Sequence, residues 1–109
     1  MMDPAAALRC RVLLSLQRAL VGEITPQMRY IGVEHSPTKI HILVWHDGEL
    51  SEIVREGFDA SVVTQVVSDF TGAEHEGMEV TFEFIRADFP ARPEFRGTLV
   101  YGRSEPGPE

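Results

Sequence analysis

The sequence contains a single cysteine, Cys10, and a single lysine, Lys39, among its 109 residues. One cysteine cannot form an intrachain disulfide, so a reducing compartment is favoured over a secreted one. Cys10 lies in an apolar helical stretch with no histidine nearby. We expect it to be a small core or half-buried residue rather than a reactive thiol.

Long hydrophobic runs and catalytic motifs are also missing from the sequence. The longest apolar runs, Ala5–Leu8 and Ile42–Trp45, are far too short to cross a bilayer, and the N-terminus has no signal-peptide pattern. There is no Gly-x-Ser-x-Gly elbow, phosphate-binding loop or paired-glycine fingerprint. The sequence therefore predicts a cytoplasmic protein that is not an enzyme and uses no cofactor.

Positive charge is scarce where negative charge is concentrated. Between Asp47 and Glu83 the chain carries ten acidic side chains and one basic one, Arg55, and its formal net charge is −7. A one-sided field of this kind speeds encounter with a basic partner and repels nucleic acid and anionic membranes. The pattern predicts a protein-binding role with no nucleic-acid or membrane partner. The alternative is that the acidic residues only keep the protein soluble.

Histidines and neighbouring carboxylates raise two further hypotheses. His46 with Asp47 and Glu49 could form a metal site in a loop, although zinc sites usually show tighter ligand spacing and more cysteine. Glu74 and Glu76 flank a histidine and could form a catalytic carboxylate pair. Acid–base catalysis needs a buried or crowded carboxyl, whereas this turn is bordered by glycine. We therefore expect solvent-exposed or hydrogen-bonded histidines with no metal, and solvated side chains in the turn of Glu74 and Glu76.

Two segments show helical periodicity. In residues 4–21, leucine or valine recurs every four residues after Asp3, a candidate N-cap. In residues 51–70, phenylalanine and valine recur at the same spacing, with Ser51 as a candidate cap. A strand over residues 61–67 is the main alternative, because valine has only modest helix propensity.

The remaining segments alternate as strands do. Residues 28–35 and 39–46 are joined by a tight turn and predict an antiparallel hairpin. Residues 78–84 and 94–102 predict two more strands, separated by a proline-containing loop.

The element order is therefore α-β-β-α-β-β. It predicts an α+β fold over residues 1–103, in which a four-stranded antiparallel sheet carries two helices on one face. The predicted core includes Leu16, Ile42, Val66 and Phe82. Residues 104–109, which contain two prolines and a glycine, predict a flexible tail.

Trp45 is the candidate apolar anchor for a partner. If Ile40, Ile42 and Val44 face the helices, Trp45 faces outward, at or near the surface and just before the acidic stretch. A partner or a homodimer through the sheet could then cover this apolar outer face. A core tryptophan that faces the helices is the alternative. The predicted partner-binding residues are Trp45, Asp47, Glu49, Glu52, Glu56, Glu74 and Glu76.

Three segments, Arg18–Pro26, Trp45–Glu52 and Asp59–Phe70, resemble small immunity proteins. These proteins belong to contact-dependent growth inhibition and related polymorphic bacterial toxin systems, and the similarity covers residues 12–102. The resemblance implies a non-enzymatic protein that binds a cognate toxin domain, commonly a nuclease, at its active site or an adjacent surface. Immunity families differ in contact surface, so the resemblance assigns no toxin-contact residue.

An immunity protein that neutralises a toxin with a basic surface is therefore the leading hypothesis. The alternative is a homodimeric α+β protein that binds another protein or a small ligand through its sheet face.

Overall fold

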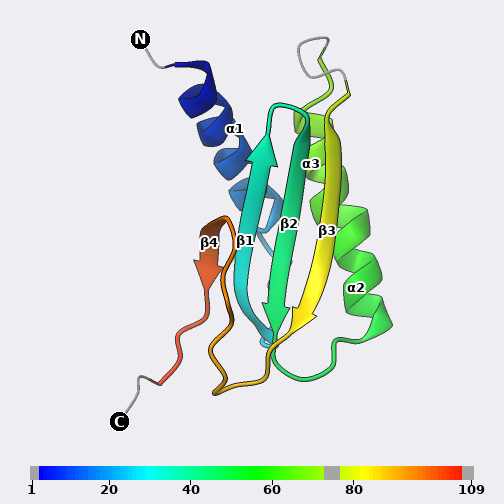
Figure 1. Ribbon diagram of the computed structural model, residues 1–109. Coiled ribbons are helices and arrows are strands. Elements are labelled where there is room, and N and C mark those ends of the chain that lie inside the picture. The colour runs from blue at the N-terminus through cyan, green and yellow to red at the C-terminus, as the bar shows by residue number, and fades with distance from the viewer. Residues whose placement is uncertain (1–2, 73–76, 107–109) are drawn as a thin grey trace.

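The chain folds into one four-stranded sheet covered on one face by helices (Figure 1). The computed structural model describes residues 3–72 and 77–106. The elements are α1 (Pro4–Ala19), β1 (Met28–Ser36), β2 (Lys39–His46), α2 (Glu52–Phe58), η1 (Asp59–Val63), α3 (Thr64–Asp69), β3 (Glu79–Arg86) and β4 (Thr98–Gly102). The strand order is β3-β2-β1-β4. The α+β class and the placement of both helical segments on one face are confirmed.

Helix α1 begins as its sequence predicts. The Asp3 carboxylate accepts a hydrogen bond of 3.0 Å from the Ala6 amide, and Pro4 occupies the first turn. Val12 and Leu16 are buried against the sheet. Cys10 is exposed, so its prediction as a core or half-buried residue is wrong. It lies two positions before Val12 and therefore on the other side of the helix.

The second helical segment runs without a break through α2, η1 and α3, so the strand alternative for residues 61–67 is wrong. Ser51 caps it by accepting a hydrogen bond of 3.2 Å from the Val54 amide. The element η1 is a π-helical turn. The apolar repeat of four residues is longer than the α-helical period of about 3.6 residues. The wider π-turn offsets this difference and keeps Phe58, Val62 and Val66 buried.

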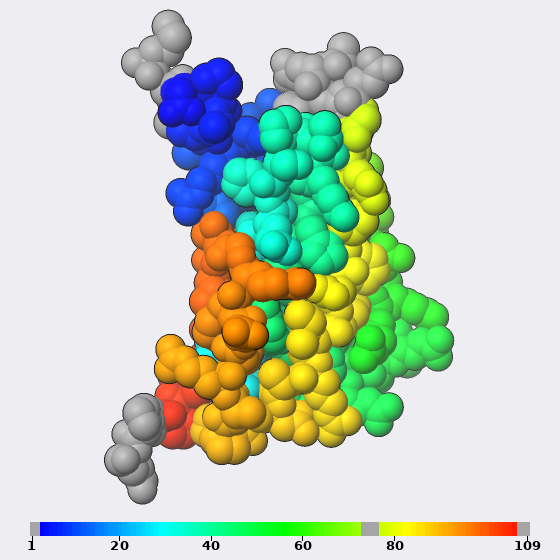
Figure 2. Space-filling model, in the orientation of Figure 1, coloured from blue at the N-terminus to red at the C-terminus, as the bar shows by residue number. Residues whose placement is uncertain are grey.

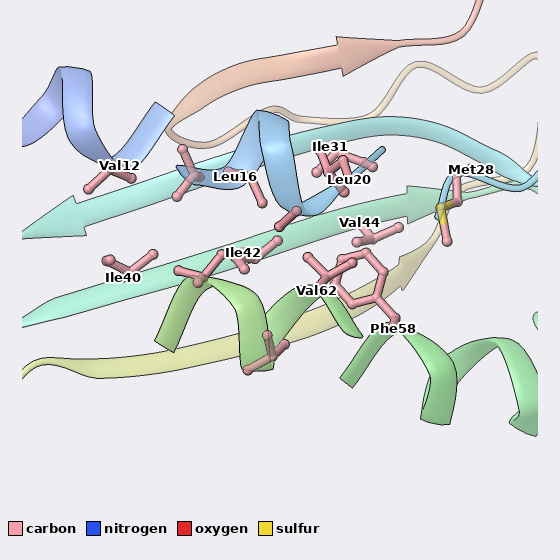
Figure 3. Packing of buried hydrophobic residues seen from close by; sticks show 14 of the residues in the cluster. Val12, Leu16, Leu20, Met28, Ile31, Ile40, Ile42, Val44, Phe58 and Val62 are labelled. Carbon is pink, nitrogen blue, oxygen red and sulfur yellow. The ribbon is translucent and has the colours of Figure 1, made fainter. Parts of the chain in front are cut away.

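The hydrophobic core lies between the helices and the sheet. Figure 3 shows side chains of α1 and of the second helical segment meeting those of β1 and β2. Leu16, Ile42 and Val66 belong to the buried cluster, and Phe82 packs against it, as predicted. Each fully buried side chain of this kind contributes about 1.5–3 kcal/mol relative to an exposed one.

The sheet is mixed rather than antiparallel, which corrects the sequence prediction. Strand β1 pairs antiparallel with β2 and β4, but β2 pairs parallel with β3, so that His41 lies opposite Thr81. The helical segment between β2 and β3 causes the difference. It carries the chain back along the sheet to the end where β2 started, so β3 must run in the same direction as β2.

Residues 87–97 connect the two edge strands, β3 and β4, by crossing the outer face of the sheet (Figures 1 and 2). We call this segment the strap. Phe95 packs edge-on against Tyr30 and Trp45, with ring centroids 4.7 and 5.4 Å apart. Strand β4 therefore starts at Thr98 and not at residue 94, because the backbone turns at Gly97, where φ is +71°.

Trp45 is buried, with 2% of its surface exposed, so the prediction of a surface tryptophan is wrong. The face assignment behind that prediction is right: Ile42 and Val44 join the core cluster, and Trp45 points to the opposite face. The chain itself covers that face with Phe95. Gly32 makes room for the ring, since a Cβ there would lie 3.2 Å from Trp45.

Candidate partner-binding surface

Two groups of acidic side chains bear on a binding surface, and the first is held in ion pairs. Asp47 Oδ2 lies 3.3 Å from Arg103 Nη2. Asp69 accepts hydrogen bonds from the Ser15 hydroxyl at 2.7 Å and from Arg18 at 3.1 Å. These carboxylates stabilise the fold, and their charge is compensated locally.

Glu83 on β3 also belongs to the paired group. Its carboxylate contacts Arg96 of the strap and lies 3.4 Å from His41 Nε2. Burial opposes ionisation of Glu83, but hydrogen bonds from His41 and Arg96 lower its pKa. The ion pair of Glu83 with Arg96 is a second link between the strap and the sheet, in addition to the packing of Phe95.

The second group lies at α2. Glu49, Glu52 and Glu56 are exposed, and none forms an ion pair or a side-chain hydrogen bond with any part of the chain that the structure describes. Glu52 in the first helical turn suits the helix dipole. Glu56 follows it at the i+4 position, where like charges destabilise a helix by about 0.2–0.5 kcal/mol. Negative charge accumulates here at a small cost to the fold.

Arg55, the only base in the acidic stretch, does not pair with these residues. Its guanidinium carbon lies 5.1 Å from the centroid of the Phe84 ring, a cation–π arrangement. Its Nε donates to the Leu50 carbonyl oxygen at 3.4 Å. The base is therefore turned toward the sheet. Among the residues described, Glu49 interacts through its charge with Arg86, and no ion pair neutralises Glu52 or Glu56.

Ile53 lies within this acidic group and is 81% exposed, the highest value among the exposed large hydrophobic side chains of the described chain. The sequence analysis missed it because it lies outside the four-residue apolar repeat that starts at Phe58. An apolar residue outside the helical stripe and next to acidic residues is the signal that could have found it. We call the group of Glu49, Glu52, Ile53 and Glu56 the α2 surface.

The structure thus separates the predicted partner-binding residues. It brings Glu49, Glu52 and Glu56 together on the α2 surface. It places Trp45 under the strap, and it ties Asp47 to Arg103 and to the Phe89 amide, which donates at 3.3 Å. Glu74 and Glu76 lie outside the described residues.

A buried ion pair, which the sequence analysis also missed, holds the end of the described chain. Arg29, 2% exposed, lies at a bulge in β1 and donates to both Glu105 carboxylate oxygens, at 2.6 and 2.9 Å. The hydrogen bond from Arg29, joined by one from Tyr30, lowers the pKa of Glu105 to about 2. Glu105 therefore lies against the domain. The boundary predicted after residue 103 stays a prediction.

Arg29 also binds the strap. Its Nη1 donates to the carbonyl oxygens of Ala87 and Ala91, both at 2.7 Å. One guanidinium therefore connects β1, the start of the strap and Glu105. This arrangement satisfies the charge that Arg29 buries, and it fixes the strap over the outer face.

The histidine positions bear on the metal hypothesis. His46 is buried, its Nδ1 lies 2.7 Å from the Gly48 carbonyl oxygen, and burial lowers its pKa. A neutral ring with a proton on Nδ1 fits this contact. Across residues 3–72 and 77–106, no three His, Cys, Asp or Glu side chains converge in a group that could hold a metal ion.

The outer face stays open at the hairpin end of β1 and β2. A shallow pocket of about 260 Å³ lies there, lined by Glu34, His35, Ser36, Lys39 and His41. Its volume falls just below the range of about 300–1,000 Å³ that is usual for small-molecule sites.

Within the described part of the chain, no helix is both long and apolar enough to cross a membrane.

Uncompensated negative charge around an exposed apolar side chain is an arrangement typical of protein-binding domains. The sequence comparison names the family. Residues 9–105 match the MafI2 immunity protein family, and the chain belongs to it. No curated protein is significantly similar to the chain. The match confirms the resemblance to small immunity proteins of polymorphic toxin systems, whereas the link to contact-dependent growth inhibition stays a prediction.

Proposed function

We propose that this protein binds a cognate bacterial toxin domain and neutralises it by occupying its surface. The family match over residues 9–105 carries the proposal. The uncompensated acidic group on α2 supports it, because charge complementarity steers association and selects the partner. The protein acts by stoichiometric binding in the cytoplasm and needs no cofactor.

The toxin domain presents a basic surface. Nucleases have such surfaces, because their clefts must attract phosphate. A nuclease toxin, in a contact-dependent growth inhibition system or a related one, therefore matches the charge of this protein. The same negative charge keeps nucleic acid and anionic membranes away from the immunity protein itself.

The strap bears on the alternative of a homodimer that binds through the sheet. Phe95 already covers Trp45 on the outer face, and Arg29 holds the strap at Ala87 and Ala91. A second copy would have to displace these contacts to reach the apolar part of the sheet. The small pocket at the hairpin end is an open part of that face.

The test uses the product of the gene next to this one, which the proposal expects to contain the toxin domain. Cells that express the toxin domain alone should stop growing, and cells that also express this protein should grow. The purified proteins should form a complex, and inhibition should be complete at one equivalent of immunity protein. Inhibition at a small fraction of an equivalent would indicate an enzymatic antidote instead. Growth arrest despite co-expression, with no complex in solution, would contradict the proposal.

A further inference from the structure

Helix α2 displays an unpartnered apolar side chain in a field of one sign. Ile53 is 81% exposed, and Glu56 follows it at the i+3 position, where side chains on a helix are neighbours. Glu52 precedes it directly, and Glu49 lies in the segment just before the helix. The apolar side chain thus has acidic residues on either side of it along the chain.

Charge pairing distinguishes this surface from three other acidic positions in the same stretch. Asp47, Asp69 and Glu83 each face an arginine within the fold, and Arg55 is turned toward Phe84. Glu52 and Glu56 form no ion pair in the described chain, whereas the charge of Glu49 interacts with that of Arg86 at the end of β3. Glu52 and Glu56 can therefore contact the cations of another molecule with no internal ion pair to break first.

The position of α2 suits an approach from outside. It projects at the margin of the molecule beyond the edge strand β3 (Figures 1 and 2). Phe58 and Val62, which are buried in the core, anchor the second helical segment to the sheet. A rigid helix presents the surface, so little ordering is needed on binding.

We propose that the α2 surface is the docking site for the toxin domain, with Ile53 as its apolar centre and Glu49, Glu52 and Glu56 as its charged rim. The occupant is a protein surface with an apolar depression ringed by arginine or lysine. This inference rests on the proposed function. It assigns no binding role to Trp45 or Asp47, which the fold itself uses.

Val21 offers a matched control for Ile53. It is 79% exposed, and it lies in the segment after α1, beside Arg18, which pairs with Asp69. Ile53→Ala and Val21→Ala each shorten an exposed aliphatic side chain, so neither should change the stability of the free protein by more than about 0.5 kcal/mol. Circular dichroism melts of both variants check this expectation.

Binding of the purified toxin domain then tests the docking site. Ile53→Ala should raise Kd at least about thirtyfold, as for a central residue of an interface, and Val21→Ala less than about threefold. If the wild-type protein and Ile53→Ala bind the toxin equally well, the α2 surface is not the docking site. The proposed function would still stand, because the complex forms. A large loss for Val21→Ala with none for Ile53→Ala would place the interface at the end of α1 and would also overturn the assignment of the α2 surface.

Charge is tested separately with two triple variants of equal charge change. Glu49→Gln, Glu52→Gln and Glu56→Gln together should lower the association rate at least about tenfold. Glu23→Gln, Glu79→Gln and Glu94→Gln together, all away from α2, should lower it less than about threefold. Equal effects of the two triples would show that only net charge matters and would contradict a rim at α2. Absence of any complex with the wild-type protein would instead contradict the proposed function.

Discussion

Arg29 is a buried charge whose partners lie far along the chain. It bonds Glu105 and two strap carbonyls, so one side chain near the start of β1 holds segments that follow it by more than fifty residues. A buried ion pair adds little net stability over an apolar pair of equal size, but breaking it is costly because one charge is left buried. The position is therefore sensitive to loss of Glu105.

Glu105→Gln should lower the free energy of unfolding by about 3 kcal/mol near neutral pH, the low end for a buried pair that loses one partner. The carbonyls of Ala87 and Ala91 still accept from Arg29 and limit the loss. Urea unfolding followed by circular dichroism measures the change. Glu94→Gln, at an exposed acid on the strap, is the control and should cost less than about 0.5 kcal/mol.

The pKa of Glu105 predicts how this difference depends on pH. Because the folded pKa is about 2 and the ordinary value is 4.5, ionised Glu105 stabilises the fold fully above pH 4.5. That stabilisation is lost as the pH falls through the window between these two values. The gap in stability between the wild type and Glu105→Gln should therefore narrow steadily below about pH 5. A gap that stays constant down to about pH 2 would contradict the assigned role of the carboxylate.

The strap is the element that the sequence analysis did not recognise. Its glycine at position 97 combines a left-handed backbone with close packing: φ is +71°, and a Cβ would lie 2.3 Å from the Val33 carbonyl oxygen. Gly48 has nearly the same φ, +70°, but no atom within 4 Å of the position that a Cβ would occupy. Substitution of each glycine by alanine therefore distinguishes the effect of backbone strain from that of steric overlap.

Gly97→Ala should destabilise the fold by about 3 kcal/mol or more, because strain and overlap act together. Gly48→Ala should cost only about 1–2 kcal/mol, from strain alone. Chemical denaturation of both variants measures the difference. Similar losses would mean that the strap shifts easily and is not seated tightly on β1.

Local sequence patterns predicted the helices and strands. Long-range contacts determine the direction of β3 and the burial of Trp45, which local patterns do not encode. The hairpin of β1 and β2, both caps and the apolar stripes follow from residue spacing. The direction of β3 depends on how the helical segment returns along the sheet, which no local pattern encodes. Trp45 was assigned to the correct face, but its cover, Phe95, is fifty residues away and was predicted to belong to a strand.

The candidate site was predictable only in part for a related reason. The density of acidic residues is visible in the sequence, but which of them are neutralised depends on arginines elsewhere, such as Arg18, Arg96 and Arg103. Only the folded chain shows that Asp47 is paired and that Glu52 is not. Ile53 became recognisable when the helix register placed it outside the core.

At the scale of the whole molecule, charge is distributed unevenly. The formal net charge is −7. Ion pairs neutralise Glu105 and Asp47 near the C-terminal segment, whereas Glu52 and Glu56 form none in the described chain, so α2 keeps a negative field. Screening shortens the reach of such a field from about 10 Å at 0.1 M salt to about 3 Å at 1 M. Association with the toxin domain should therefore be sensitive to salt.

The association rate should fall about tenfold between roughly 50 and 500 mM salt, while the dissociation rate changes little. Stopped-flow or surface-based kinetics can measure both rates. A dissociation rate that rises steeply with salt, with a constant association rate, would place the charges at the centre of the interface rather than at its rim. Neutral osmolyte at equal viscosity is the control for slowed diffusion.

The burial of Trp45 under Phe95 gives the protein an optical probe of its own, because this is the only tryptophan in the chain. Its indole reports the state of the strap, on the face of the sheet opposite the helices. Release of the strap exposes the indole ring of Trp45 to water and shifts its fluorescence emission to longer wavelength. Docking at α2 leaves the ring in the same surroundings. One fluorophore can therefore distinguish loosening of the fold from capture of a partner that itself lacks tryptophan.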